Sequence, residues 1–220
     1  MIKAVLFDLD GTLVNSLEDL AVSTNYALKK YGFPTYETEK YKYFVGDGLL
    51  KLVERVLPED ARNEENVNKL YQAFWNYYSE HYVVNTVAYD GIIELIAKLK
   101  QKGFMLAVIS NKPHEMAINV VSELLGDNFD VVYGKQEGYP TKPNPALTLK
   151  VMNDICVTPD ECVFVGDSGM DAANAVNAGC IGIGVLWGFR TEDELLSCGA
   201  NYIVNKPDEI LNILDKINNK

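Results

Sequence analysis

Apolar residues along the chain follow two alternating patterns. Short continuous apolar runs, which are typical of strands buried on both faces of a sheet, occupy residues 4–7, 104–109, 130–133, 162–165 and 181–185. Most segments between them place apolar residues at the spacing of one helix face, as at 92–99, 117–124 and 210–217. Alternating strands and helices predict an α/β fold, with a Rossmann-like parallel sheet core covered by helices on both faces.

Residues 16–82 break this alternation because they carry helical signals alone. One apolar stripe begins at Leu17 and its helix is predicted to end near Gly32, while aromatic side chains recur at near-helical spacing towards the end of the segment. A segment of roughly 65 residues suits a small separate domain. We therefore expect an α/β core formed by 1–15 and 83–220, with an inserted α-helical domain at 16–82. The aromatic stripe is predicted to pack inside the insert rather than to bind a ligand.

Composition and charge narrow the class of protein. The 220 residues are 48% hydrophobic and 23% charged, as in ordinary globular proteins, and the formal net charge is −11. A surface this acidic repels nucleic acid and anionic membranes, so neither is expected as a partner. The apolar run at the N-terminus is short and is interrupted by Asp8 and Asp10, which is a poor signal peptide, so we expect a cytoplasmic protein. The four cysteines form no CxxC pair and are expected to be reduced thiols.

Two carboxylates follow the first predicted strand in the segment Asp8-Leu9-Asp10-Gly11-Thr12. Like charges held within ~4–6 Å raise the pKa of one of them, and a bound cation removes that cost. Mg²⁺ prefers carboxylate oxygens and leaves room for waters and a substrate phosphate, so it is the expected cofactor. Gly11 permits a tight turn and a close approach of backbone amides to a phosphate.

Polar residues also follow three later segments of the core. Ser110 and Asn111 follow the second strand and can hold phosphate oxygens without adding charge. Lys142, in a loop before a helical pattern, supplies a cation to oppose the aspartates and a phosphate. Asp167 follows the fourth strand and Asp171 lies one helical turn later, which predicts a further metal ligand and an acid that supports it. Ligands of open α/β sheets bind beyond the carboxyl ends of the strands, where we expect these segments to meet.

Each segment alone has an ordinary structural explanation, such as a turn, a helix cap or a surface loop. In combination, FDLDGT, ISN, the lysine of KPNP and GDSGMD resemble the haloacid dehalogenase superfamily of phosphohydrolases over nearly the whole chain. The resemblance implies a Mg²⁺-dependent phosphatase that acts on a small phosphorylated metabolite. It also implies that the insert is a small helical cap, which closes over the site and excludes water.

The resemblance assigns a role to each matching position. Asp8 would attack phosphorus, and Asp10 would act as general acid on the leaving alcohol and then as general base for water. Lys142 would stabilise the nucleophile and the aspartyl-phosphate. The phosphate would be bound by Gly11, Thr12, Ser110 and Asn111. The metal would be bound by Asp8, Asp167 and the backbone carbonyl of Asp10, with Asp171 supporting this shell.

Two further segments resemble the phosphoglycolate phosphatases of this superfamily. The sequence VGDG at 45–48 resembles their VGxG loop, and VLWGFR at 185–190 with CGAN at 198–201 resembles their C-terminal run. Hydrolysis of 2-phosphoglycolate to glycolate is therefore the favoured reaction. Lys42 precedes the VGDG loop, where an arginine is expected nearby, so the residue that binds the substrate carboxylate is left open.

Other functions stay open. Related members hydrolyse pyrophosphate or other small phosphates, and β-phosphoglucomutase-like sugar phosphomutases share the helical cap and both aspartates. A non-catalytic phosphate-binding module is a further class. Asp10 weighs against dehalogenation, which does not need the second aspartate. His114 is expected in the first turn of a helix near the site and His81 at the end of the insert, and the protein is expected to be a monomer or a homodimer.

Overall fold

The computed structural model describes residues 1–219, and the chain divides into two compact units. The sheet unit contains residues 1–14 and 88–219, and the helical unit contains residues 15–87. The chain passes between them through β2 (Val14–Asn15) and β3 (Val87–Ala88), which pair in a two-stranded sheet. In the part of the chain that is described, no helix is both long and apolar enough to cross a membrane.

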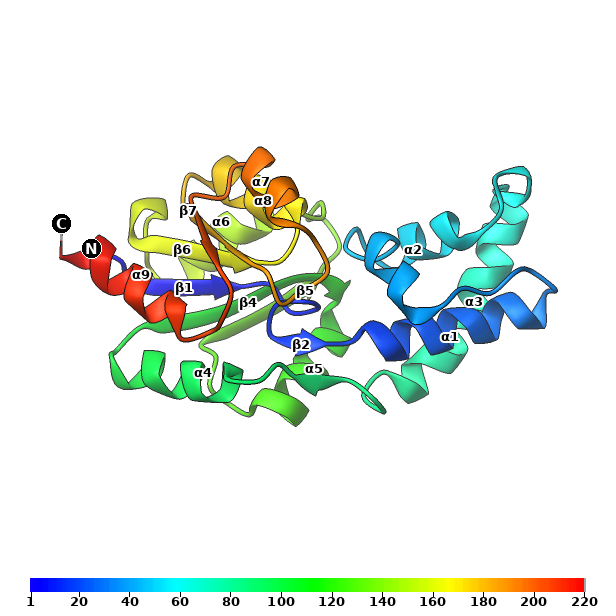
Figure 1. Cartoon of the computed structure of the whole chain (residues 1–220), viewed down its shortest axis with the longest axis horizontal. Coiled ribbons are helices and arrows are strands. Elements are labelled where there is room, and N and C mark those ends of the chain that lie inside the picture. The colour runs from blue at the N-terminus through cyan, green and yellow to red at the C-terminus, as the bar shows by residue number, and fades with distance from the viewer. Residues whose placement is uncertain (220) are drawn as a thin grey trace. The chain divides into compact units, whose positions relative to one another are not determined.

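The sheet unit is built on six strands in the order β5-β4-β1-β6-β7-β8 (Figure 1), and all neighbouring strands are parallel. The strands are β1 (Ala4–Phe7), β4 (Met105–Pro113), β5 (Val131–Lys135), β6 (Cys162–Gly166), β7 (Ile181–Val185) and β8 (Tyr202–Val204). The helices are α4 (Ile92–Gln101), α5 (His114–Leu125), α6 (Ala146–Asp154), α7 (Gly169–Ala178), α8 (Glu192–Ser197) and α9 (Glu209–Asn218), with a 3₁₀ turn at Pro159–Glu161. Because β1 lies between β4 and β6, three strands end side by side at the centre of the sheet.

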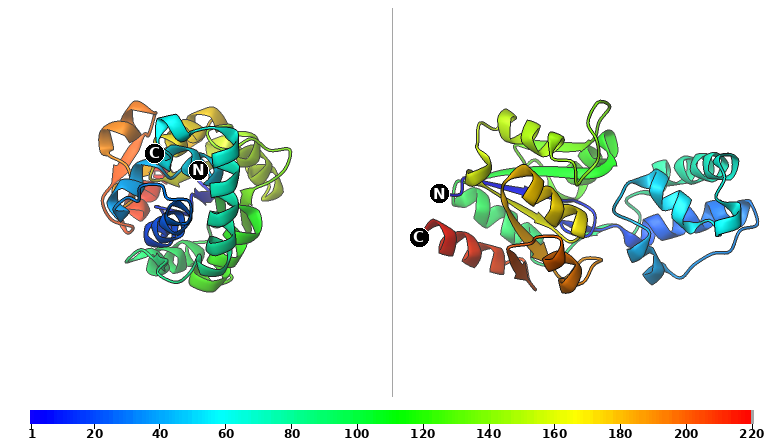
Figure 2. Two further views of the ribbon diagram at one scale, coloured as in Figure 1. Left: turned by 90° about the vertical axis from the view of Figure 1, so that its right-hand side faces the viewer. Right: turned by 90° about the horizontal axis from the view of Figure 1, so that it is seen from above.

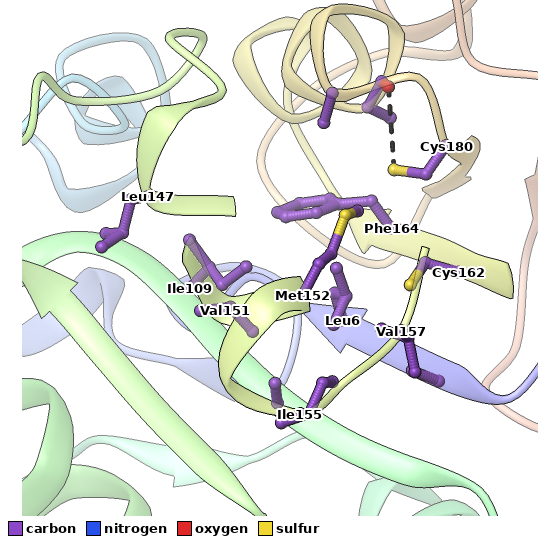
Figure 3. Close-up of a cluster of buried hydrophobic side chains, with 14 residues drawn as sticks. Leu6, Ile109, Leu147, Val151, Met152, Ile155, Val157, Cys162, Phe164 and Cys180 are labelled. Carbon is purple, nitrogen blue, oxygen red and sulfur yellow. Dashed lines mark hydrogen bonds between the residues drawn. The ribbon is translucent and has the colours of Figure 1, made fainter. Parts of the chain in front are cut away.

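Hydrophobic side chains bury both faces of this sheet. On one face, Leu6 and Phe164 of adjacent strands pack with Met152 of α6 in a cluster that α7 completes (Figure 3). Successive strand residues point to opposite faces, and Val5 and Val108, on the other face, are equally buried. Helices α4 and α5 cover that face (Figure 1). Burial on both faces explains why the strands read as continuous apolar runs instead of alternating ones.

The two ends of the described chain lie together at the end of the sheet where the parallel strands begin. The Ile2 amide, just before β1, donates to Oδ1 of Asn218 at 2.6 Å, and Figure 2 shows both termini together at this end. The carboxyl ends of β1, β4 and β6 lie at the opposite end, where the predicted site residues are found in the strand ends and in the loops that follow. Chain ends and candidate chemistry are therefore separated by the length of the sheet.

The helical unit consists of α1 (Leu17–Lys30), α2 (Leu49–Val56) and α3 (Glu64–His81), with 3₁₀ turns at Thr38–Tyr43 and Glu59–Ala61. α1 packs along α3, and the predicted stripe of α1 is buried from Leu17 to Leu28. The aromatic stripe of α3 contributes to the core as predicted, because Phe74 and Tyr78 are fully buried. Near the start of α1, the buried Asp19 carboxylate accepts hydrogen bonds from the segment 84–86 at 2.7–3.0 Å.

The five predicted strands are all present, with β1 and β7 at the predicted residues. The sequence pattern did not reveal β8, which is a three-residue edge strand, nor α2 and α8, which are only eight and six residues long. Short elements give too few repeats for a period to be recognised. The helical unit extends to Val87 instead of the predicted 82, because Asp19 binds the non-helical segment 84–86 to α1.

Candidate active site

The pairing of the central strands brings the predicted segments to one edge of the sheet. Phe7 pairs with Val108 of β4 and with Val165 of β6, so the residues that follow each of them lie next to one another. The Asp8 amide continues this pattern by donating to the Val165 carbonyl at 2.9 Å. Asp8 and Asp167 are nine-tenths or more buried there, although carboxylates are rarely buried without a partner.

Lys142 supplies a cation to this group of acids. Its Nζ lies 2.6 Å from Oδ1 of Asp8 and 2.7 Å from Oδ1 of Asp171, and it donates to the Ile109 carbonyl at 3.0 Å. Burial lowers the pKa of Lys142, but the charges of Asp171 and Asp8 outweigh this effect and raise it above its ordinary value. Lys142 is therefore a permanent cation whose three N–H donors all have acceptors.

Three buried acids crowd around that single cation. Oxygens of Asp8, Asp167 and Asp171 lie within 4.8 Å of one another. Burial, together with the charges of Asp171 and Asp167, raises the pKa of Asp8 well above its usual range in spite of Lys142. Burial and the charge of Asp171 likewise raise the pKa of Asp167 to about 7. An excess of buried carboxylate oxygens over cations is the donor set that a hard divalent ion such as Mg²⁺ fits.

Helix α7 fixes the position of Asp171. Ser168 is its N-cap, and Asp171 completes a capping box in which Oδ2 accepts from the Ser168 amide at 3.1 Å and from Oγ at 2.6 Å. Its other oxygen is held by Lys142. A Cβ at Gly166 would lie 2.2 Å from the Asp171 side chain, so glycine is required behind it. Asp171 is thus held by Lys142 on one oxygen and by the start of its own helix on the other.

Asp167 is enclosed by two glycines and by the segment after β7. Gly11 adopts φ +94°, and a Cβ there would lie 2.4 Å from an Asp167 oxygen. A Cβ at Gly188 would lie 2.3 Å from the Asp167 Cβ. The Phe189 amide donates to Oδ2 of Asp167 at 2.8 Å, and Thr12 donates through Oγ1 to Oδ1 at 3.3 Å. The segment after β7 therefore belongs to the site, which the sequence indicated only through the WGF resemblance.

Ser110 and Asn111 were predicted to follow a strand ending at Ile109, but β4 continues to Pro113, so both residues lie within its carboxyl end, where they are buried. The Asn111 side chain accepts from the Lys142 amide at 2.9 Å and donates to the Lys142 carbonyl at 3.5 Å, so it holds the lysine loop. The Ser110 hydroxyl accepts from the Lys112 amide at 3.2 Å. Their binding of phosphate stays a prediction, as does that of Gly11 and Thr12.

The Asp10 carboxylate is not part of the three-acid group and has a different partner. Lys112 donates hydrogen bonds from Nζ to both carboxylate oxygens, at 3.1 Å to Oδ1 and 3.3 Å to Oδ2. The Lys112 side chain is 1% exposed and that of Asp10 is 21% exposed. The sequence did not single out Lys112 as a site residue. Lys112 comes directly after Ser110 and Asn111, at the carboxyl end of a central strand, and this position could have indicated that it belongs to the site.

Other predicted residues are found in both units. His114 begins α5, where its Nδ1 accepts from the Gly134 amide at 3.3 Å. His81 ends α3 and stacks on Tyr77 with ring centroids 4.0 Å apart. In the helical unit, the VGDG loop is bound by Arg55, which donates to the Phe44 carbonyl at 3.1 Å and pairs with Asp47 of the loop. An arginine therefore does lie beside this loop, contributed by α2 and not by the residues preceding the loop.

A cavity of about 540 Å³ lies beside α4 and the start of α9. Tyr89 and Trp187 line it, and none of the predicted site residues does. Trp187 donates through Nε1 to the Thr12 carbonyl at 2.9 Å, so the cavity lies behind the loop that follows β1. We assign the chemistry to the buried charges and not to this cavity, because the cavity lacks the carboxylate cluster.

Comparisons with known proteins agree with this geometry. Residues 5–185 match the family model of the haloacid dehalogenase-like hydrolases. A phosphoglycolate phosphatase of Chromobacterium violaceum is 33% identical over 97% of this chain and 96% of its own, and one of Aquifex aeolicus is 31% identical over 97% of both. The crystal structure of a protein described as a predicted phosphoglycolate phosphatase, from Haemophilus somnus 129pt, superimposes with a TM-score of 0.90. It is 30% identical, and the match covers 97% of this chain and 98% of that one.

Proposed function

The chain belongs to the haloacid dehalogenase-like hydrolase family, and we propose that it hydrolyses a small phosphate monoester, favoured as 2-phosphoglycolate, through a phosphorylated Asp8. The observation that supports this most directly is the contact between Asp8 and Lys142. A buried carboxylate at the end of the central strand is held at 2.6 Å from a buried ammonium, among acids that raise its pKa. Such a strained charge distribution is typical of catalytic groups.

Asp8 is the nucleophile in this proposal, and Lys142 keeps it in place. A carboxylate that attacks a phosphate monoester is an anion approaching an anion, so the surrounding cations must reduce the repulsion. Lys142 contributes one positive charge at 2.6 Å and also neutralises Asp171 at 2.7 Å. Formation of an acyl-phosphate on Asp8 divides a slow hydrolysis into two faster displacements.

Asp10 moves the protons of both steps. It gives a proton to the alcohol oxygen as that oxygen leaves phosphorus, and it then accepts a proton from the water that attacks the aspartyl-phosphate. Its carboxylate is 21% exposed, whereas Asp8 is more deeply buried, so Asp10 can exchange protons with solvent between the steps. General acid–base catalysis of this kind contributes about 10²–10⁴-fold to a rate.

Mg²⁺ is the proposed cofactor. Asp8, Asp167 and the Asp10 carbonyl would hold it, with Asp171 supporting them, and the buried oxygens of the acid group fit a hard cation. The ion would stabilise the negative charge that grows on the transferring phosphoryl group. Gly11 and Gly188 press the backbone against Asp167, which fixes one of these oxygen donors independently of the ion.

The choice of 2-phosphoglycolate rests on two relatives that are named phosphoglycolate phosphatases. The match covers nearly the whole length of both relatives and of this chain. Thr12, Ser110 and Asn111 are proposed to bind its phosphate. The helical unit is proposed to act as the cap of this family. The proposed partner is thus a small phosphorylated metabolite, and the proposed location is the cytoplasm.

A phosphate-release screen tests this proposal. Purified protein is incubated with 2-phosphoglycolate, pyrophosphate, hexose phosphates and nucleotides, with and without Mg²⁺. We expect Mg²⁺-dependent release that is fastest from 2-phosphoglycolate. Release from none of these compounds would remove the phosphatase proposal, and conversion of a hexose 1-phosphate to its isomer with little free phosphate would replace it by a mutase.

A further inference from the structure

The two aspartates that follow β1 are bound to different lysines. Lys142 is fully engaged by Asp8, Asp171 and the Ile109 carbonyl. Within residues 1–219, the Asp10 carboxylate accepts hydrogen bonds from Lys112 alone, at 3.1 Å to Oδ1 and 3.3 Å to Oδ2. Because one ammonium faces both oxygens, it fixes the direction in which the carboxylate points.

Burial distinguishes this pair from the surface ion pairs of the same unit. The Lys112 side chain is 1% exposed, whereas Lys100 and Asp130 form a pair in which the side chains are 38% and 37% exposed. A lysine is almost never fully buried unless it is paired, because the charge loses its hydration and the long side chain loses its rotamer freedom. Burying Lys112 therefore costs free energy, through lost hydration and lost rotamer freedom, that a solvent-exposed pair does not lose.

The backbone around Lys112 is shaped to place it. The pairing of β4 with β5 changes register between Ile109 and Pro113, and such irregularities re-aim side chains at the ends of strands. The Lys112 amide donates to the Ser110 hydroxyl at 3.2 Å. On the other side, a Cβ at Gly134 would lie 2.4 Å from the Lys112 carbonyl oxygen, so only glycine allows β5 to approach this closely.

We infer that Lys112 positions the Asp10 side chain so that its protonated carboxyl group can give its proton to the leaving oxygen. The inference rests on the proposed function, in which Asp10 is the general acid. The donor oxygen must approach the leaving oxygen to within about 2.6–3.2 Å, and a misplacement of about 1 Å costs about 10²-fold in rate. Lys112 transfers no proton itself, so it is a positioning residue and acts through Asp10.

The choice of leaving group separates this role from a general effect on the site. Phosphoryl transfer from an alkyl phosphate such as 2-phosphoglycolate needs a proton for its strongly basic leaving alcohol. Transfer from 4-nitrophenyl phosphate needs it far less, because nitrophenolate is a weak base. The value of kcat/KM reports the first transfer to Asp8 for both substrates, before the hydrolysis step that they share.

Lys112→Met is the decisive variant. We expect kcat/KM for 2-phosphoglycolate to fall about 10²-fold, while kcat/KM for 4-nitrophenyl phosphate falls less than about tenfold. Lys112→Arg keeps a cation and is expected to recover part of the difference between the substrates. Lys100→Met removes a lysine from an exposed pair on the same unit, so it should leave both values within about twofold of the wild type.

Equal losses for the two substrates in Lys112→Met, or no loss at all, would overturn the inference alone. Hydrolysis of neither substrate by the wild type would overturn the proposed function and this inference with it. Gly134→Ala provides a second variant, because it displaces the Lys112 backbone and retains every charge. It should reduce the reaction with 2-phosphoglycolate more than that with 4-nitrophenyl phosphate, and a variant that folds without this preference would also contradict the inference.

Discussion

Both units of the molecule bury carboxylates, and they surround them in opposite ways. In the helical unit, Asp19 is 2% exposed, and its hydrogen-bond donors among residues 1–219 are uncharged groups of the segment 84–86. In the sheet unit, Asp8, Asp167 and Asp171 are packed against one another around one lysine. The pKa of Asp8 is raised well above its usual range there, and that of Asp167 to about 7.

The difference separates a structural acid from a reactive one. Donors that fully satisfy a buried carboxylate fix the backbone that carries them, as Asp19 does for the return of the chain from α3. Acids that are buried beside other acids stay electrostatically unfavourable until a cation joins them. Removing Asp19 should therefore affect folding, and removing one of the strand-end acids should affect chemistry. The predictions below test this distinction.

The largest effect is expected from Asp8→Asn. Phosphate release should fall at least about 10⁴-fold, because the amide cannot attack phosphorus. The free energy of unfolding should change by less than about 1 kcal/mol, since Lys142 keeps its contact with Asp171 and one buried like charge is lost. Phosphate release and chemical denaturation of the same preparation measure both quantities.

Asp215→Asn is the matched control for that variant. Asp215 lies on α9 of the same unit, 55% exposed and paired with Lys102 at 3.0 Å. Both activity and stability should stay near the wild-type values because exposed pairs contribute little. Full activity of Asp8→Asn would remove the assignment of the nucleophile, and its failure to fold would contradict the distinction drawn between the units.

Much of this distinction could be predicted from the sequence, but only for the sheet unit. Asp8, Lys142 and Asp167 follow apolar runs or lie in loops of an alternating pattern, and parallel strands end at one edge of a sheet, so their convergence follows from topology. Lys112 was not predicted because its aim depends on the register change near Pro113. Such a change arises from tertiary packing, and no local period signals it.

Asp19 was not predicted either, for a different physical reason. It lies in the first turn of α1, where an acidic residue is ordinary because it complements the helix dipole. Its partners are more than sixty residues further along the chain, in a non-helical segment with no periodic pattern. Asp19 therefore looked like an ordinary first-turn acid, and its contact with the segment 84–86 was not predicted. For this reason the predicted insert ended at residue 82, before the segment that Asp19 binds.

The second prediction concerns Asp19→Ala. The change removes the acceptor of every hydrogen bond that the segment 84–86 makes to α1, and we expect a loss of about 3 kcal/mol in the free energy of unfolding. Glu18→Ala, at the adjacent exposed position of the same helix turn, should cost less than about 0.5 kcal/mol. Denaturant titrations followed by circular dichroism compare the two, and equal losses would show that Asp19 acts only as a first-turn acid.

The third prediction is a pH dependence of stability in protein without Mg²⁺. The pKa of Asp167 rises from 3.8 to about 7 on folding, so between these values the folded state binds the proton more tightly than the unfolded state. Its contribution to stability is therefore complete below pH 3.8 and is lost as the pH rises through about 7. The melting temperature should fall between pH 6 and pH 8, by about 2–4 °C for each kcal/mol lost.

Mg²⁺ should reverse that loss because it replaces the proton on the acid group. The increase in melting temperature on adding Mg²⁺ is expected to be larger at pH 8 than at pH 6. Asp167→Asn, which cannot ionise, should show a smaller pH dependence and a smaller response to Mg²⁺. An equal response of wild type and variant would mean that Asp167 does not bind the ion.

The smallest effect is expected for thiol reactivity, and it tests whether the units unfold independently. All four cysteines lie in the sheet unit: Cys156 is exposed, and Cys162 and Cys180 are buried with pKa values that burial raises to about 12. At pH 8, a thiol-reactive dye should label Cys156 rapidly and the buried pair at least about 10³-fold more slowly, since the thiolate is the reacting form.

In Asp19→Ala, the labelling of Cys162 and Cys180 should stay within about threefold of wild type, because the lost contacts lie entirely in the helical unit. Mass spectrometry of the labelled peptides measures this, and exposure of the buried pair in the variant would show that the two regions fold as one.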